Sequence, residues 1–298
     1  MADTLHNYIT LFRGRADCYG HWDGGCVKEP LTEQQFRQHL TTGPHIGVYP
    51  ALNVNGTTHV AWGCTDIDYD DFGEASRLRD TFKAVGVQAW VEKTRKGWHI
   101  WVFATTLVPA EDMRNMFLAA HQVADSNPKE VNPKQTTLHG NAVGNYVRLP
   151  YPTGDGANVR YIVAANGERI SLDDFTSIAV EQRTTPEKIA DLATYYIPPV
   201  LPTREVLAPS HDMTEAARRL TPLGKVVFRD GPIEGRDRST ALACLAHQCF
   251  ESGLPVGDAI TLMEDADLRW GKFMVRGETG RIELVKLVQR AYGVTLST

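Results

Sequence analysis

A proline-rich segment near residue 200 divides the sequence into two parts and most limits what the chain can fold into. Four prolines fall within a dozen residues there: Pro198, Pro199, Pro202 and Pro209. Proline has a fixed φ and no backbone N–H, so such a segment cannot continue a helix or a central strand. We therefore predict a stiff linker over residues 197–211, with one domain over 1–196 and another over 212–298. A chain of 298 residues is long enough for two ordinary domains.

Before the linker, short apolar runs alternate with amphipathic stretches, a pattern typical of α+β or α/β folds. The predicted strands are His45–Tyr49, His59–Asp68, Gln88–Lys93, Trp98–Ala104, Asn145–Leu149 and Val159–Ala164. The predicted helices are Thr32–Leu40, Gly73–Val85, Pro109–Asp125, Ser171–Ile178 and Pro186–Tyr195.

After the linker the pattern becomes helical. Apolar residues recur at steps of three and four over Ser239–Ser252, Val256–Trp270 and Arg281–Tyr292. This spacing gives each segment one apolar face, so residues 212–298 are predicted to form a small helical bundle.

Composition excludes several classes of protein. The chain is 42% hydrophobic and 22% charged, which is typical of a globular protein and not of a disordered or coiled-coil chain. The net charge of −5 argues against non-specific coating of DNA but leaves room for a local basic groove. Five widely spaced cysteines do not form a disulfide framework. No apolar stretch is long enough to span a membrane and the N-terminus lacks a signal core, so we expect a cytoplasmic protein.

Two acidic residues in a predicted strand carry the strongest chemical signal. Asp66 and Asp68 are two residues apart, so their side chains project from the same side of the strand. Two carboxylates held this close repel each other, and a hard cation such as Mg²⁺ or Mn²⁺ relieves the repulsion. The alternative is an acidic strand end that faces water. Asp70 and Asp71 are interpreted as the solvated exit from this strand.

A predicted hairpin follows about 30 residues later. Its two apolar strands are joined by a short basic turn that ends at Gly97. His99 lies beside this turn, and Thr94, Arg95 and Lys96 would complete a donor-rich pocket suited to phosphate oxygens. The alternative is an ordinary hairpin with a hydrogen-bonded histidine.

A third group of polar residues follows the longest predicted helix of the first domain. Glu130 could supply a further oxygen ligand from a neighbouring strand, and Lys134, Gln135 and Arg148 could bind phosphate or a base. The alternative is a charged loop followed by an edge strand that Pro150 ends.

A zinc site is not expected. The residues that would have to form it are Cys18, His21, Cys26 and His39. Their spacing is irregular for a zinc site, so ordinary thiols and surface histidines are the better interpretation.

Taken in order, these segments resemble the archaeo-eukaryotic primase superfamily, and in particular the primase-polymerases of phages, plasmids and bacterial conflict systems. The matching residues are Asp66 and Asp68, then Thr94, Gly97, His99 and Trp101, then Glu130 with Pro133-Lys134-Gln135, and last Gly144-Asn145-Tyr146-Val147-Arg148-Leu149-Pro150. The resemblance extends over roughly residues 5–165 and departs at Glu130, where many relatives have aspartate. In the second domain, Arg236-Asp237-Arg238-Ser239 loosely resembles a Gly-x-Arg-x segment of such proteins.

The resemblance implies an α+β catalytic domain, with an RRM-like mixed sheet and flanking helices, followed by a helical C-terminal domain. It also implies a DNA primase-polymerase that makes and extends primers on single-stranded DNA during phage or plasmid replication, by two-metal nucleotidyl transfer. Two Mg²⁺ or Mn²⁺ ions would be held by Asp66, Asp68 and Glu130. His99 would contact the phosphates of the incoming nucleotide.

The resemblance further implies which residues bind the nucleotide and which partners the chain has. The nucleotide-binding candidates are Tyr49, Thr94, Arg95, Lys96, Gly97, His99, Lys134 and Arg148. Tyr49 would either face the sugar or simply pack. The partners would be a single-stranded DNA template with its primer and nucleoside triphosphates, either NTP or dNTP, with no membrane. The sequence has no phosphate-binding loop of a helicase motor, so a replicative helicase would act in trans or belong to a longer parent chain, in a bacterial or phage-infected cell.

Two other classes of function remain open. A metal-dependent nuclease or replication-initiation protein would also use acids and a histidine, but His99-Ile100-Trp101 lacks the second histidine of a nicking enzyme. A non-catalytic nucleic-acid-binding module would have no need of three acidic side chains. A metal-dependent extension assay on primed and unprimed single strands distinguishes the three.

Overall fold

A computed structural model describes residues 2–126, 128, 130–138, 140, 142–198, 208–232 and 237–293. The chain divides into two compact units, Met1–Ile197 and Pro198–Thr298. Residues 199–207 of the expected linker lie outside the described part, as does Arg236.

The described residues of the first unit form two β-sheets. The larger has the strand order β10-β6-β7-β5-β4, and β8 also pairs with β5. Its strands are β4 (Leu52–Val54), β5 (Thr57–Ile67), β6 (Trp90–Lys93), β7 (Trp98–Pro109), β8 (Glu130–Asn132) and β10 (Tyr161–Val163). The smaller has the order β2-β1-β3-β9 and consists of β1 (Tyr19–His21), β2 (Cys26–Val27), β3 (Ile46–Val48) and β9 (Val147–Arg148).

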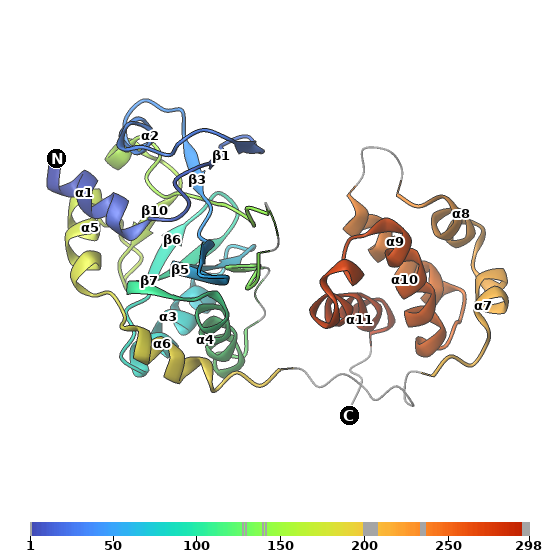
Figure 1. Cartoon of the computed structure of the whole chain (residues 1–298). Coiled ribbons are helices and arrows are strands. Elements are labelled where there is room, and N and C mark those ends of the chain that lie inside the picture. The colour runs from blue at the N-terminus through green and yellow to red at the C-terminus, as the bar shows by residue number, and fades with distance from the viewer. Residues whose placement is uncertain are drawn as a thin grey trace. The chain divides into compact units, whose positions relative to one another are not determined.

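Helices cover both faces of the larger sheet (Figure 1). The helices of this unit are α1 (Ala2–Leu11), α2 (Glu33–His39), α3 (Phe72–Ala84), α4 (Ala110–Val123), α5 (Leu172–Glu181) and α6 (Pro186–Ala193), with a 3-10 turn at Gly154–Gly156. The alternation of β7 explains the two layers, because Ile100 and Val102 share one core with α3, α4 and α6. Trp101 and Phe103 point the other way into a second core with α1 and α5.

Side-chain caps fix where several helices begin. The hydroxyl of Thr32 and the side chain of Gln35 form a capping box at the start of α2. The carboxylate of Asp71 accepts a hydrogen bond from the backbone N–H of Glu74, 3.1 Å away, and so caps α3. Asp71 is thus a helix cap and not merely a solvated strand exit.

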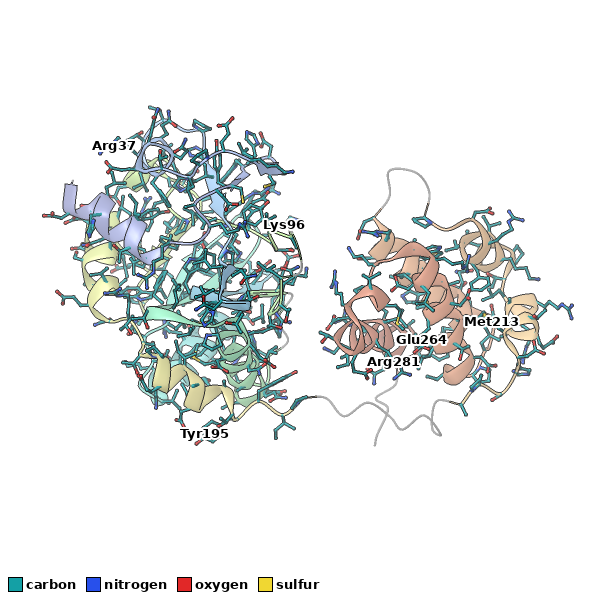
Figure 2. All side chains as sticks on the ribbon, in the orientation of Figure 1. Arg37, Lys96, Tyr195, Met213, Glu264 and Arg281 are labelled. Carbon is teal, nitrogen blue, oxygen red and sulfur yellow. The ribbon has the colours of Figure 1, made fainter. Side chains whose placement is uncertain are left out.

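The second unit is helical. It contains α7 (Met213–Arg219), α8 (Pro222–Asp230), α9 (Arg238–Glu251), α10 (Val256–Trp270), a 3-10 turn at Met274–Arg276 and α11 (Glu278–Tyr292). Its core comes from α7, α9, α10 and α11 and includes Leu245, Met263 and Leu284. Glu264 of α10 and Arg281 of α11 form an ion pair of 2.6 Å across their helices, and they are labelled side by side in Figure 2.

The α+β class of the first unit and the helical nature of the second are confirmed. The expected mixed sheet is wrong in one respect: among the described residues every ladder between named strands is antiparallel, and the parallel pairing is the isolated bridge Ala104–Thr184. Strand β7 also extends to Pro109, past the predicted end at Ala104, because its last residues pair with the start of β5. In the described part of the chain, none of the helices is both long and apolar enough to cross a membrane.

Candidate active site

Four polar residues lie in one row across the larger sheet. Asp66 of β5 is the register partner of Glu130 in β8 on one side and of His99 in β7 on the other. His99 is in turn the partner of Glu92 in β6. Side chains that oppose each other directly across a ladder share a face, so all four project from the same face of the sheet.

This row marks the end of an apolar surface. The next row along the same face contains Cys64, Trp101 and Trp90, all buried in the core with α1 and α5. The side chain of Glu92 is fully buried, that of His99 is 11% exposed and that of Asp66 is 25% exposed. Side-chain exposure therefore increases from Glu92 toward Asp66, and the polar row is open to solvent at the end formed by Asp66 and Glu130.

A glycine allows the β6–β7 turn to approach the end of β5. A Cβ atom on Gly97 would lie 2.0 Å from the carbonyl oxygen of Ile67 and 2.8 Å from the backbone nitrogen of Tyr69. The Thr94 hydroxyl accepts a hydrogen bond of 3.1 Å from the Gly97 N–H and so stabilises the turn. Arg95 and Lys96 are exposed on this turn, which lies beside the carboxylate-bearing end of β5.

The imidazole of His99 lies between two carboxylates. Its Nδ1 donates to Glu92 Oε2 at 3.1 Å, and its Nε2 is 3.6 Å from Asp66 Oδ1. Glu92 also accepts hydrogen bonds from Trp101 Nε1 at 2.7 Å and from Arg160 Nη1 at 2.6 Å. Burial alone would raise the pKa of Glu92, but the Arg160 guanidinium and the bonds from His99 and Trp101 hold that pKa below its usual value. Glu92 is therefore an ionised carboxylate in the interior.

At the other end of the row, Glu130 has two polar neighbours. Lys134 Nζ lies 2.9 Å from Glu130 Oε1, and the side-chain amide of Asn145 donates to the same oxygen at 3.5 Å. Gln135 holds Asn145 in place, because the two residues exchange hydrogen bonds of 2.8 and 3.1 Å. The Pro133-Lys134-Gln135 and Gly144-Asn145 segments thus meet at the third acid of the row.

The opposite face of the sheet anchors β8. The Thr65 hydroxyl donates to the carbonyl oxygen of Glu130 at 3.2 Å and lies 2.8 Å from His121 Nε2. Arg114 of α4 donates to the carbonyl oxygens of Val131 and Pro133, the latter at 3.1 Å. These contacts fix the backbone that carries Glu130.

The donor chemistry and the register of the acids fit a divalent cation. Asp66 lies near the end of β5, and Asp68 comes directly after its last residue, Ile67, so the strand ends one residue before the predicted end. Glu130 lies on a neighbouring strand opposite Asp66, as predicted. Carboxylate oxygens are the ligands that Mg²⁺ and Mn²⁺ take in proteins. Among the described residues, no three His, Cys, Asp or Glu side chains are already gathered closely enough to hold an ion. Lys134 now pairs with Oε1 of Glu130, so a cation shared with Asp66 and Asp68 would compete with Lys134 for this carboxylate.

Two of the proposed nucleotide-binding residues have other contacts. Arg148 lies in the smaller sheet, where its guanidinium donates to the carbonyl oxygen of Trp22 at 2.8 Å and lies over the Trp22 ring. Tyr49 is buried, with its ring 5.4 Å from that of Tyr146. These contacts agree with the packing role considered for Tyr49.

His39 makes contacts that do not suit a metal ligand. Its Nε2 lies 2.9 Å from the carbonyl oxygen of Pro150, and its Nδ1 accepts a hydrogen bond from the backbone N–H of Ile46. Desolvation by burial lowers the pKa of this imidazole to about 3. It is a buried structural histidine, and not the surface histidine that was expected.

Glu92 and Arg160 belong to the site but were not predicted from the sequence. Glu92 is the last acidic residue of a short apolar strand and precedes Lys93, which makes it look like a strand end. Its position seven residues before His99, across a four-residue turn, is the signal that could have identified it, because a hairpin of that length pairs the two. Arg160 has no comparable signal, since its side chain reaches Glu92 from a distant loop.

Comparison with known proteins defines the class. Residues 26–192, more than half of the chain, match the family described as “TOTE conflict system, Archaeo-Eukaryotic Primase domain”. The chain belongs to this archaeo-eukaryotic primase family, whose members are primase-type nucleotidyltransferases. The family resemblance of the sequence is thereby confirmed.

A search of solved structures returns a crystal structure titled primase RepB′. It shares 14% sequence identity, with 98% of this chain and 94% of that chain covered and a TM-score of 0.31. No curated protein matches the chain.

Proposed function

We propose that this chain is a DNA primase-polymerase that synthesises and extends primers on single-stranded DNA by template-directed nucleotidyl transfer. The observation that supports it is the row Glu130–Asp66–His99, in which two acids and an imidazole from three strands share one face. Family membership supports the class of reaction, and we propose the row as its site.

In this reaction the 3′-hydroxyl oxygen of the primer bonds to the α-phosphorus of a nucleoside triphosphate. The bond from that phosphorus to the bridging oxygen breaks, pyrophosphate leaves and the hydroxyl proton is lost. Two Mg²⁺ or Mn²⁺ ions, held by Asp66, Asp68 and Glu130, would supply a lowered pKa for the hydroxyl and neutralise the triphosphate.

The chain's own residues then orient the nucleotide. His99 turns its Nε2 edge toward Asp66 and the open side of the row, where it can contact a phosphate oxygen. Arg95 and Lys96 are exposed on the adjacent turn, and their positive charges suit the same triphosphate. Lys134 lies at the far end of the row and would transfer from Glu130 to phosphate when Glu130 changes partner.

We further propose the nucleic-acid partners and setting. Template and primer would be held chiefly through their phosphates, which makes binding tolerant of sequence and sensitive to salt. Either NTPs or dNTPs would serve as substrates, and a helicase acting in trans or in a longer parent chain would supply single-stranded template. The role would be phage or plasmid replication in the bacterial cytoplasm.

An extension assay tests the proposal. The full chain is incubated with Mg²⁺ or Mn²⁺, nucleotides and single-stranded DNA, with and without a primer. We expect products longer than the primer, and new short chains on the unprimed template. Products shorter than the primer would instead identify a nuclease, and retention of the DNA without any product would identify a binding module.

A further inference from the structure

We infer that Glu92 is a positioning residue that fixes the orientation of the His99 ring for contact with the triphosphate. The inference rests on the proposed function and adds a residue to its site. Glu92 does not reach the open side of the row, since its side chain is fully buried. It acts through His99.

The two oxygens of Glu92 have different partners. Oε2 accepts hydrogen bonds from His99 Nδ1 at 3.1 Å and Trp101 Nε1 at 2.7 Å. Oε1 accepts from Arg160 Nη1 at 2.6 Å. Because an ionised carboxylate only accepts, the Nδ1 atom of His99 must carry the proton of this contact, and the Nε2 edge is turned toward Asp66.

Arg160 is itself held firmly. Its guanidinium also donates to the carbonyl oxygen of Arg148 at 3.3 Å, and its carbonyl oxygen accepts from the backbone N–H of Tyr151 at 2.5 Å. Strands β6 and β7 and the loop before β10 therefore converge on Glu92. Because Trp101 and Arg160 also hold the Glu92 carboxylate, it cannot move with the His99 ring. Rotation of the ring would break the hydrogen bond between them, so the bond restrains the orientation of the ring.

Stability alone does not account for this arrangement. A buried ion pair gains little over apolar side chains of the same volume, because both charges lose their hydration. In the adjacent row on the same face, the corresponding positions are apolar: Cys64, Trp101 and Trp90 pack together there. The Glu92–Arg160 ion pair lies instead in the row in which His99 faces the solvent-exposed end.

Glu92→Gln is the variant that tests this role. A glutamine side chain has one acceptor oxygen where the carboxylate has two, so either Arg160 or the His99 and Trp101 pair loses its acceptor. We expect the Michaelis constant for the nucleotide to rise on the order of 10-fold to 100-fold in primer extension, as for a displaced catalytic contact. The affinity for primed DNA should be unchanged.

Asp258→Asn is the matched control. Asp258 is a fully buried carboxylate of α10 in the second unit, and it accepts a hydrogen bond from His211 Nδ1 at 2.6 Å and another from the backbone N–H of Ser210. The change removes the same kind of buried acid–histidine contact away from the row. This control should lower the melting temperature and leave the Michaelis constant for the nucleotide unchanged.

A spectroscopic measurement tests the same inference without relying on activity. In the ¹⁵N-histidine-labelled chain, with the His99 signals assigned through His99→Gln, we expect a proton on Nδ1 of His99. Glu92→Gln should shift the ring nitrogen resonances of His99 and of no histidine in the second unit.

The outcomes separate the two claims. A wild-type chain that extends no primer overturns the proposed function, while the His99 signals still decide the positioning role. A wild-type chain that extends primers, together with a Glu92→Gln variant whose nucleotide Michaelis constant is unchanged and whose turnover alone is lower, makes Glu92 a purely structural residue. An unprotonated His99 Nδ1 in the wild type also overturns the inference.

Discussion

At the scale of single residues, the site is a row of three carboxylates, each of which has a basic or imidazole side chain beside it. Glu130 faces Lys134, Asp66 faces His99, and Glu92 faces both His99 and Arg160. Each carboxylate thus has a cationic or imidazole neighbour, and these contacts offset the electrostatic repulsion between the acids. In the proposed reaction, a phosphate-bound cation would enter at the exposed end of this row, at Asp66 and Glu130.

His121, buried on the opposite face of the sheet, makes the stability of the first unit sensitive to acid. Desolvation lowers the pKa of His121 to about 4, below the ordinary value of 6.5. Between these values the unfolded chain binds a proton that the folded chain does not, so stability is fully present above pH 6.5 and is lost as the pH falls toward 4. The difference corresponds to roughly 3 kcal/mol. His121 also contacts Thr65, which supports the backbone of Glu130.

Denaturant unfolding at pH 7 and pH 4.5 checks this prediction. The wild type should lose more stability between the two pH values than His121→Gln, which cannot take up the proton. An equal loss in both proteins would show that His121 is not the group responsible.

At the scale of secondary-structure elements, the β6–β7 turn is the part that assembles the site. The turn approaches the end of β5 so closely that only glycine fits at position 97. Gly97→Ala should push the turn away from Ile67 and Tyr69, displace His99 relative to Asp66, and lower primer extension on the order of 10-fold or more.

Gly156→Ala is the matched control for that variant. A Cβ atom there would meet only the Thr153 hydroxyl at 3.6 Å, an ordinary contact. Extension rates of both variants, measured beside their melting temperatures, test the prediction. Full activity of Gly97→Ala would contradict the close approach.

The pattern of apolar residues along the sequence predicted the strands that hold the proposed site residues better than it predicted the small sheet. The carboxylate strand and the histidine hairpin are nearly continuous apolar runs, and the hairpin has a glycine at its turn, so both could be predicted from the sequence. Strand β8 is only three residues long, too short for a pattern, yet Glu130 was expected on a neighbouring strand and lies there. The small sheet of β1, β2, β3 and β9 depends on pairings between distant segments, which periodicity cannot show.

Contacts between distant segments also decided which candidates came together. The four residues of the row are set by ladder register, and three of them were identified from the sequence. Arg148 is predicted to contact the nucleotide, and in the structure its guanidinium donates to the carbonyl oxygen of Trp22, because β9 pairs with β3 in the other sheet. Charge alone could not have revealed that partner.

At the scale of the whole molecule, the two units have separate cores. The first contains two cores on the two faces of the larger sheet, and the second has a core of its own. All residues of the proposed catalytic row belong to the first unit. The helical unit is therefore not needed to form the row. We expect it to hold the initiating nucleotide or the template, because ordering two nucleotides without a primer carries the largest entropic cost.

Truncation after Ser210 tests that division of labour. We expect the shortened chain to extend a supplied primer at close to the wild-type rate, because the row is intact. De novo priming should weaken on the order of 10-fold or more, because two nucleotides must then be ordered without a second binding surface. Rates of primed and unprimed synthesis are measured side by side, and equal loss of both would count against the assignment.

The most direct test of the account is the activity of Asp66→Asn beside that of Asp70→Asn in primer extension. Asp66 is the centre of the row, whereas Asp70 lies four residues on, 68% exposed and paired with Lys93 at 2.5 Å. We predict that Asp66→Asn lowers extension on the order of 10³-fold, because one charge at the reacting phosphate is lost, and that Asp70→Asn leaves it unchanged. Synthesis by Asp66→Asn at the wild-type rate would contradict the central claim.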